Sequence, residues 1–277
     1  METNPNGEYI VVFDPLDGSQ NVPASLTVGA IFGVFKTKNF EEVTCGNQMV
    51  AAGYALFSSA LTFAFCSDVT PLTFSQFDFE NNIWVEYEKN HKQPKKGKTY
   101  AINEGNSANW DPTIQAFIAN HMRGRRSVRW MCCMAADVHR QLVEGGCFIY
   151  PQDTKYPQGR LRLLYEAVPL AFIWEKCGRG VALATTEGDR ILDIKISHLD
   201  IHARCGVIYL GEDETMMFNK LKACNPTWAG GQVSHEERKH DKKVEEDKSH
   251  LKSEISLLRA AVIVGVVCQI AILVRNR

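Results

Sequence analysis

Short apolar runs bounded by turn-forming residues mark the first part of the chain. Residues 9–13 (YIVVF) are all β-branched or aromatic, which predicts a strand covered on both faces. Residues 26–35 predict a second strand, broken at Gly29 and Gly33. The first third of the chain is therefore expected to be rich in strands.

The next runs are longer and less uniform. Residues 49–65 are small and apolar and fit either a helix or a packed strand. Residues 74–87 alternate like a hairpin that turns at Asn81-Asn82. Residues 88–98 are polar and contain proline and glycine, which predicts an internal boundary there.

The pattern beyond this boundary alternates between helical and strand-like segments. Helices are predicted at 111–122, 135–145 and 170–177. Strands are predicted at 147–150, 181–184 and 207–210. A layered mixture of α and β elements follows from this alternation.

The end of the chain differs from the rest. Residues 234–252 are dense in charged side chains and predict a solvated helix or linker, rather than a coiled coil, because the apolar seam is short. The run Ala260–Val274 (AAVIVGVVCQIAILV) follows between flanking arginines. As a helix it would span about 22 Å, slightly less than the usual membrane span. We favour a tail anchor over a core helix, because only Gln269 interrupts the apolar surface.

Composition and charge narrow the function classes. The 277 residues can bury a sizeable core, and the formal net charge of -1 gives no reason to expect nucleic acid as a partner. The nine cysteines are scattered without C-x-x-C pairs or zinc-ligand spacing, which favours a reducing compartment. The N-terminus has no secretory signal pattern, so we expect the folded part in the cytosol or on the cytoplasmic face of an organelle membrane.

Candidate chemistry begins where the first apolar run ends, at DPLDGSQN. Pro15 and Gly18 favour a rigid turn at a sheet edge, which would direct Asp14 and Asp17 to one site. Two carboxylates with the Leu16 carbonyl suit Mg²⁺, with Mn²⁺ or Zn²⁺ as alternatives. Taken alone, such a motif is more often an ordinary Asp-rich turn.

Several longer motifs accompany it. DPLDGSQN, NQMVAAGYALF, YAINEGNSANWDP, MAADVHRQLVEGGCFIYP and GRLRLLYEAVPLAFIWEKCG together resemble class I fructose-1,6-bisphosphatases, in order and with closely matching spacing. The resemblance covers residues 8 to about 221. It implies a layered α/β/α sugar-phosphatase fold, a homotetramer, and Mg²⁺-dependent hydrolysis of the 1-phosphate of fructose 1,6-bisphosphate, a step of gluconeogenesis.

The resemblance also implies residue roles. Asp14, Asp17 and Glu166 correspond to metal-binding carboxylates with catalytic roles, and the Leu16 carbonyl to a further ligand. Independently, Pro169 fits only the first turn of a helix, which predicts Glu166 near the open end of that helix. The residues that correspond to substrate-binding positions are Asn103, Arg129, Met134, Tyr150 and Arg160, with Arg129 reaching in from a neighbouring subunit. Apart from the resemblance, Ser19 and the amides that follow it in the motif could hold a phosphate oxygen.

The implied chemistry is metal-assisted phosphoryl transfer without a covalent enzyme intermediate, and the chain shows no Ser-His or Cys-His nucleophile pattern. His139 is predicted to be a structural hydrogen-bonding residue in the middle of a helix. The chain departs from the family at Gln20, Trp130, Cys132-Cys133 and Arg160, where the family usually has Ser, Tyr, Gly-Ser and Lys.

The family's upstream segment, with further metal-binding glutamates, has no counterpart in this sequence, so an N-terminally truncated fold is expected. The expected division is 1–95 for the rest of the N-terminal domain, 96–223 for a substrate-binding domain, 224–258 for a charged linker, and 259–275 for a transmembrane tail anchor. Three interpretations remain: an active fructose-bisphosphatase, a catalytically impaired and membrane-tethered sugar-phosphate-binding relative, and a sedoheptulose-bisphosphatase.

Overall fold

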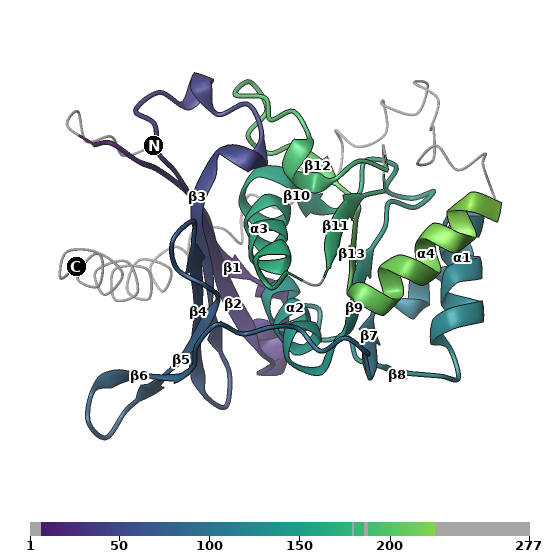
Figure 1. Cartoon of the computed structure of the whole chain (residues 1–277), viewed down its shortest axis with the longest axis horizontal. Coiled ribbons are helices and arrows are strands. Elements are labelled where there is room, and N and C mark those ends of the chain that lie inside the picture. The colour runs from purple at the N-terminus through teal and green to yellow at the C-terminus, as the bar shows by residue number, and fades with distance from the viewer. Residues whose placement is uncertain (1–6, 179, 186–187, 225–277) are drawn as a thin grey trace. The chain divides into compact units, whose positions relative to one another are not determined.

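The computed structural model describes residues 7–178, 180–185 and 188–224, which lie in one compact unit. Within this unit a six-stranded sheet, a pair of helices, a five-stranded sheet and a second pair of helices follow one another as layers (Figure 1). This arrangement confirms the predicted α/β class. The order of the layers is sheet, helices, sheet, helices.

The first sheet is antiparallel throughout, and its strand order follows the sequence. Its strands are β1 (Ile10–Asp17), β2 (Val28–Phe35), β3 (Met49–Phe57), β4 (Leu61–Ser67), β5 (Thr73–Asp78) and β6 (Ile83–Glu88). The segment 49–65 is thus two strands joined by a tight turn. The predicted hairpin at 74–87 is confirmed as β5 and β6, with Asn82 in the left-handed region at φ 56°.

Two predictions about the first strands are wrong. Gly29 and Gly33 do not break β2. They instead permit close packing against it, since a Cβ on Gly33 would lie 2.3 Å from Cε of Met49 in β3. The first strand is not covered on both faces. Val12 is buried, whereas Val11 is 55% exposed. An antiparallel sheet needs only one covered face. In the part of the chain that the structure describes, every second side chain of β1 therefore points away from the core.

The second sheet is mixed and has the order β11-β13-β9-β7-β8. The predicted strands at 147–150, 181–184 and 207–210 are confirmed as its three longest members, β9 (Gly146–Tyr150), β11 (Val181–Ala184) and β13 (Val207–Leu210). The others are β7 (Thr99–Ala101) and β8 (Ser127–Val128), and a separate ribbon pairs β10 (Leu161–Arg162) with β12 (Arg204–Cys205). These last four are only two or three residues long, so they carry no recognisable apolar pattern.

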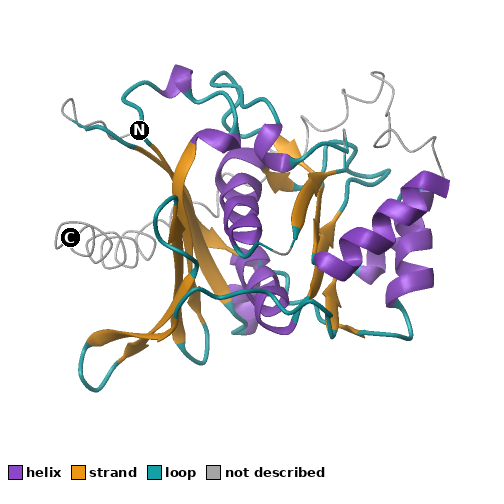
Figure 2. Ribbon diagram, viewed as in Figure 1, coloured by secondary structure: helices purple, strands orange, loops and turns teal. Residues whose placement is uncertain are grey.

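Helices α2 (Met134–Glu144) and α3 (Val168–Lys176) lie between the two sheets, and both contact strands of each sheet (Figure 2). Helices α1 (Pro112–Phe117) and α4 (Glu212–Cys224) lie on the other side of the five-stranded sheet. The three predicted helices are confirmed, while α4 was not predicted. The π-helical turns Ile118–Met122 and Leu163–Ala167 extend α1 and precede α3.

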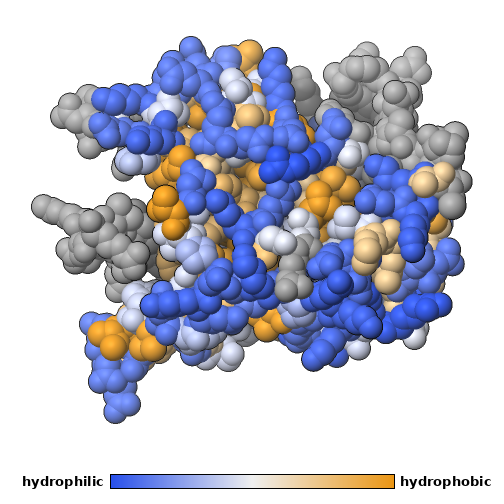
Figure 3. Space-filling view, viewed as in Figure 1, coloured by the Kyte–Doolittle hydropathy of each residue, from blue (hydrophilic) through white to orange (hydrophobic). Residues whose placement is uncertain are grey.

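The main core fills the space between the sheets and includes the fully buried side chains of Tyr54, Phe74, Trp174 and Tyr209. A second apolar cluster packs α1 and α4 against the five-stranded sheet. Burial of each such large side chain contributes roughly 1.5–3 kcal/mol. The face seen in Figure 3 is largely hydrophilic, with hydrophobic residues gathered in smaller areas between the hydrophilic ones.

The predicted tail anchor at 259–275 and almost all of the predicted linker at 224–258 lie outside the described residues. Of the helices that are described, none is long and apolar enough to cross a membrane.

Candidate active site

Asp14 and Asp17 lie at an irregularity in edge strand β1. Asp14 pairs with Ile31 and Asp17 with Gly29, and the register shifts between them. Pro15 lies in this shift, where its missing N–H is tolerated because β1 is an edge strand. The predicted position, in a turn after the strand, is therefore wrong: both carboxylates belong to the strand, which bulges between them.

Asp17 is the most enclosed of the predicted acidic residues, at 7% exposure. Its Oδ2 accepts hydrogen bonds from the backbone N–H of Ala135 (2.6 Å) and from Sγ of Cys133 (3.2 Å), at the first turn of α2. Burial raises the pKa of Asp17 to about 6, although the N–H of Ala135 partly offsets this. The start of α2 thus holds one end of the acidic motif.

Glu166 is half-buried on the π turn before α3 and meets Asp14. Its Oε2 accepts the N–H of Arg162 (2.6 Å), and its carboxyl group is in hydrogen-bonding contact with that of Asp14. Burial, followed by the charge of Asp14, raises the pKa of Glu166 well above its usual value. The structure therefore brings Asp14 and Glu166 together from segments about 150 positions apart.

The local backbone around Glu166 differs from the prediction. Pro169 does lie in the first turn of α3, as predicted. However, helical backbone already begins at Leu163, so Glu166 lies inside a π turn rather than ahead of an open helix end. Such turns insert one extra residue and are frequent at functional sites.

The carboxylates differ in how well they fit a hard cation. Among the described residues, no three His, Cys, Asp or Glu side chains form a group that could hold a metal ion. Oδ2 of Asp17 instead accepts the N–H of Ala135 at the start of α2. Asp14 and Glu166 do fit a divalent ion, because they provide two hard oxygen ligands in contact with each other. The pKa of Glu166 is strongly raised, and a bound cation would stabilise its ionised form.

A group of cationic side chains lies beside these acids. The pairing of β10 with β12 places Arg162 opposite Arg204, and Arg162 donates to the carbonyl of His202 (2.7 Å). Tyr165 lies close to both groups: burial raises the pKa of its hydroxyl, and the charges of Glu166, Asp14, Arg162 and Arg204 also affect that pKa. The same hydroxyl hydrogen-bonds Nδ1 of His202 (2.8 Å). Sequence reasoning missed this group, because two-residue strands that pair across more than 40 positions leave no local pattern.

A second group contains three aromatic rings and the half-buried cation Arg160. Arg160 hydrogen-bonds Tyr150 and lies 3.6 Å from the centroid of the Tyr156 ring. Trp130 packs edge-on against Tyr150, with ring centroids 5.3 Å apart. Within the described structure, Nε1 of Trp130 and Nε of Arg160 are buried without hydrogen-bond partners. Buried donors of this kind are normally satisfied, so they indicate a missing acceptor.

The remaining predicted residues have local contacts. The side chain of Asn103 accepts the N–H of Gly105 (3.2 Å), and exposed Arg129 donates to the carbonyl of Val128 (2.8 Å). Met134 is buried as the first residue of α2, and Ser19 is exposed at the start of the 3-10 turn Ser19–Ala24. The structure therefore gathers Tyr150 and Arg160, and it places Met134 beside Asp17, whose carboxylate accepts from the backbone N–H of Met134. No hydrogen bond or ion pair joins Ser19, Asn103 or Arg129 to these residues in the described part of the chain.

His139 has the environment of a structural residue, as predicted. It is in the middle of α2, where its Nδ1 hydrogen-bonds the hydroxyl of buried Tyr54 (2.8 Å). Burial lowers its pKa to about 4, so the ring is neutral at physiological pH. Cys133 packs tightly against the acidic motif, since a Cβ on Gly18 would lie 2.8 Å from its Cβ.

A pair of carboxylates suited to a hard cation, beside arginines and unpartnered buried donors suited to phosphate, defines this α/β protein as one that handles phosphate esters. Comparison with known proteins identifies the family. Residues 1–84 match the N-terminal domain and residues 93–223 the C-terminal domain of fructose-1-6-bisphosphatase. The chain belongs to the fructose-1,6-bisphosphatase family.

Individual relatives agree with this assignment. The chain is 35% identical over 232 residues to fructose-1,6-bisphosphatase 1 of Mus musculus, covering 80% of this chain and 67% of the relative. It is 38% identical over 208 residues to the cytosolic fructose-1,6-bisphosphatase of Spinacia oleracea, covering 70% of this chain and 59% of the relative. The chain thus spans about three fifths to two thirds of the length of these curated relatives.

Solved structures show the same fold. The crystal structure of Leishmania major fructose-1,6-bisphosphatase in apo form matches with a TM-score of 0.71 and 33% identity, over 78% of this chain and 73% of that chain. Its T-state structure matches with a TM-score of 0.72.

Proposed function

We propose that the protein hydrolyses the 1-phosphate of fructose 1,6-bisphosphate. Family membership supports this reaction, and the observation that carries it is the contact between Asp14 and Glu166 beside a group of arginines. The two unpartnered donors, on Trp130 and Arg160, support a second phosphate position next to the aromatic rings. A substrate with phosphates at both ends could place one phosphate beside Asp14 and Glu166 and the other beside the donors of Trp130 and Arg160.

The proposed roles follow from the contacts. Asp14 and Glu166, with Asp17 and the Leu16 carbonyl nearby, would hold a divalent ion, for which we propose Mg²⁺. When bound, such an ion lowers the pKa of water and neutralises charge on phosphoryl oxygens. Arg160, Tyr150 and the indole N–H of Trp130 would bind the distal phosphate.

Four further residues are proposed to support substrate binding from the edges of the site. Asn103 and Ser19 would offer an amide and a hydroxyl, and Met134 would pack beside the sugar. Arg129 is exposed beside Trp130, where it is available to a neighbouring subunit. We therefore propose a homo-oligomer, a tetramer by resemblance to the family. Analytical ultracentrifugation tests this, and a monomer at micromolar concentration would contradict it.

A sedoheptulose-bisphosphatase is the alternative that a specific observation favours. Trp130 and Cys132-Cys133 replace the smaller residues usual in the family, and Cys132 adopts a left-handed backbone at φ 57°. Such changes beside the sugar position would alter the choice of sugar.

Phosphate release from fructose 1,6-bisphosphate and sedoheptulose 1,7-bisphosphate, each with Mg²⁺ and with EDTA, tests these functions together. We expect Mg²⁺-dependent release with a preference for the fructose substrate. The reverse preference would favour the alternative. Binding of both sugars without release would favour a catalytically impaired relative.

Membrane attachment is proposed from the sequence alone. The apolar run Ala260–Val274 and its flanking arginines would anchor the chain with the folded part facing the cytosol. Without such an anchor we expect a cytosolic protein. Carbonate extraction of membranes distinguishes the two, since release into the soluble fraction would rule out the anchor.

A further inference from the structure

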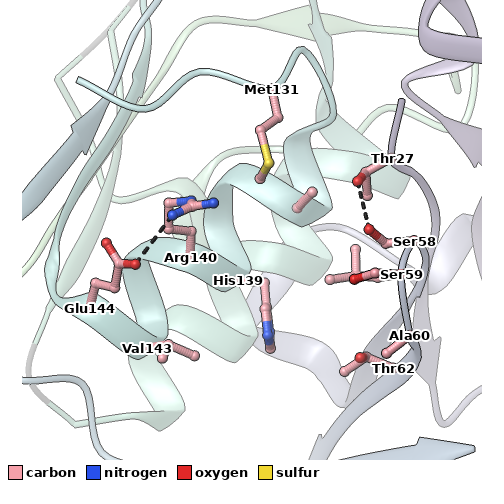
Figure 4. A pocket seen from close by; sticks show the side chains of 12 residues that line it. Thr27, Ser58, Ser59, Ala60, Thr62, Met131, His139, Arg140, Val143 and Glu144 are labelled. Atoms are coloured by element: carbon pink, nitrogen blue, oxygen red, sulfur yellow. Dashed lines mark hydrogen bonds and ion pairs between the residues drawn. The ribbon is translucent and has the colours of Figure 1, made fainter. Parts of the chain in front are cut away.

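A cavity of about 300 Å³ lies between α2 and the turn that joins β3 to β4 (Figure 4). Its lining contains none of the carboxylates and none of the phosphate-facing residues of the candidate active site. One wall is a single face of α2, from Ala136 through Arg140 to Glu144, and the other carries hydroxyl groups. Its volume is at the lower end of the range for small-molecule sites.

Two charged groups line this cavity, Arg140 and Glu144, and Arg140 is the cation. Its Nη1 lies 3.2 Å from Oε1 of Glu144 one helical turn away, and both side chains are about one third exposed, at 34% and 35%. Intrahelical pairs of this kind are weak, so an anion that offers two oxygens can compete with Glu144 for the guanidinium. His139 also lines the cavity, but it is neutral and bonded to Tyr54, so it adds no charge.

The opposite wall provides hydroxyl donors. Thr27 and Ser58 hydrogen-bond each other at 2.9 Å, and Ser59 and Thr62 lie next to them along the turn. Figure 4 shows Arg140 on one side of the cavity, with Thr27, Ser58 and Ser59 on the other. A guanidinium facing several hydroxyl groups is suited to bind the oxygens of a phosphate. Apolar contacts from Leu56 and Val143 would suit a short carbon chain attached to it.

We propose that this cavity is a second phosphate site, which binds inorganic phosphate or a phosphate monoester of a few carbons through Arg140 and the hydroxyls of the β3–β4 turn. The proposal does not depend on the hydrolytic activity, because the cavity shares no residue with the candidate active site.

The test is calorimetric titration of the full chain with inorganic phosphate and, separately, with glycerol 3-phosphate, in EDTA so that hydrolysis does not interfere. The Arg160→Gln background removes the main cation of the other phosphate position. In that background we expect each probe still to bind, and Arg140→Gln to weaken binding at least tenfold. Tighter binding of the monoester would identify it as the preferred form. The matched control is Arg125→Gln, which removes the same charge from an exposed turn and should leave binding unchanged.

A second variant keeps the test independent of folding defects. Glu144→Gln frees the guanidinium of Arg140, so binding in the Arg160→Gln background should tighten by about two- to fivefold, the equivalent of an exposed ion pair. A gain in affinity does not arise from misfolding. Absence of binding in the Arg160→Gln background, equal binding with and without Arg140, or no gain from Glu144→Gln would each overturn the proposal.

Discussion

The acidic and basic halves of the candidate active site are stabilised in different ways. Asp14 and Glu166 contact each other, and burial together with like charge raises the pKa of Glu166. Arg160 and Arg162 instead have neutral partners, a tyrosine ring and a backbone carbonyl. The arginines therefore keep their charge available for an anion, whereas the contact that Asp14 and Glu166 make with each other joins two groups of like charge. This difference indicates that a cation completes one half of the site and an anion the other.

Removing the acid that the cation would neutralise should have the largest effect. Glu166→Gln keeps the size of the side chain but removes its charge. We expect kcat to fall by about 100-fold or more with Mg²⁺ present, because charge stabilisation by a bound metal contributes several kcal/mol.

The same variant should raise the melting temperature in EDTA, because it removes the repulsion from Asp14. Glu144→Gln, at the last residue of α2 and outside the candidate active site, is the matched control and should leave kcat unchanged. An active Glu166→Gln enzyme would show that this carboxylate is not part of the metal site.

Asp17 in the candidate site and the structural residue His139 should affect the pH dependence of stability in opposite directions. The pKa of Asp17 is raised from 3.8 to about 6 in the folded state. Its contribution is therefore complete below pH 4 and is lost as the pH rises to 6, about 3 kcal/mol in all. The pKa of His139 is lowered from 6.5 to about 4, so its contribution is present above pH 6.5 and is lost as the pH falls to 4.

Denaturant titrations between pH 4 and 7 in EDTA measure both contributions. Asp17→Asn should remove the loss of stability that occurs as the pH rises. The free energy of unfolding should then increase more steeply with pH than in the wild type, because only the contribution of His139 remains. His139→Gln should remove the loss at low pH, while its amide can still bond the hydroxyl of Tyr54. Parallel pH profiles for the two variants would contradict the opposite signs.

Weakening the basic half should have a smaller effect than removing an acid. Arg160→Gln removes a charged donor to the distal phosphate, and hydrogen bonds to charged groups contribute about 1.5–3 kcal/mol. We expect kcat/KM to fall roughly 10- to 100-fold, mostly through KM, with Arg160→Lys intermediate. Arg125→Gln serves as the charge control, and steady-state kinetics is the measurement. A loss confined to kcat would place Arg160 at the reacting phosphate instead.

The sequence predicted those parts of the molecule whose signals are local. The β5–β6 hairpin and helix α2 follow from alternation and helical periodicity within about 15 residues. The bulge in β1 and the π turn under Glu166 were missed, because a shift of one residue in register or in helical winding leaves no apolar pattern. In the site, the strand-end motif already indicated Asp14, and the resemblance supplied Arg160 and the role of Glu166. Arg162 and Arg204 were missed, because only the pairing of β10 with β12 brings them together.

The smallest expected effect distinguishes a donor from a packing residue in the basic half. Trp130→Phe removes the unpartnered indole N–H while keeping an aromatic ring against Phe148 and Tyr150. If the N–H binds the distal phosphate, KM should rise, by less than in Arg160→Gln, because the variant loses one hydrogen bond from a neutral donor and no charge. Trp130→Tyr restores a donor and should recover part of the loss, whereas Trp84→Phe, on the other sheet, should change nothing. Equal KM for Trp130→Phe and wild type would mean that this ring only packs, and that Arg160 and Tyr150 bind the phosphate without it.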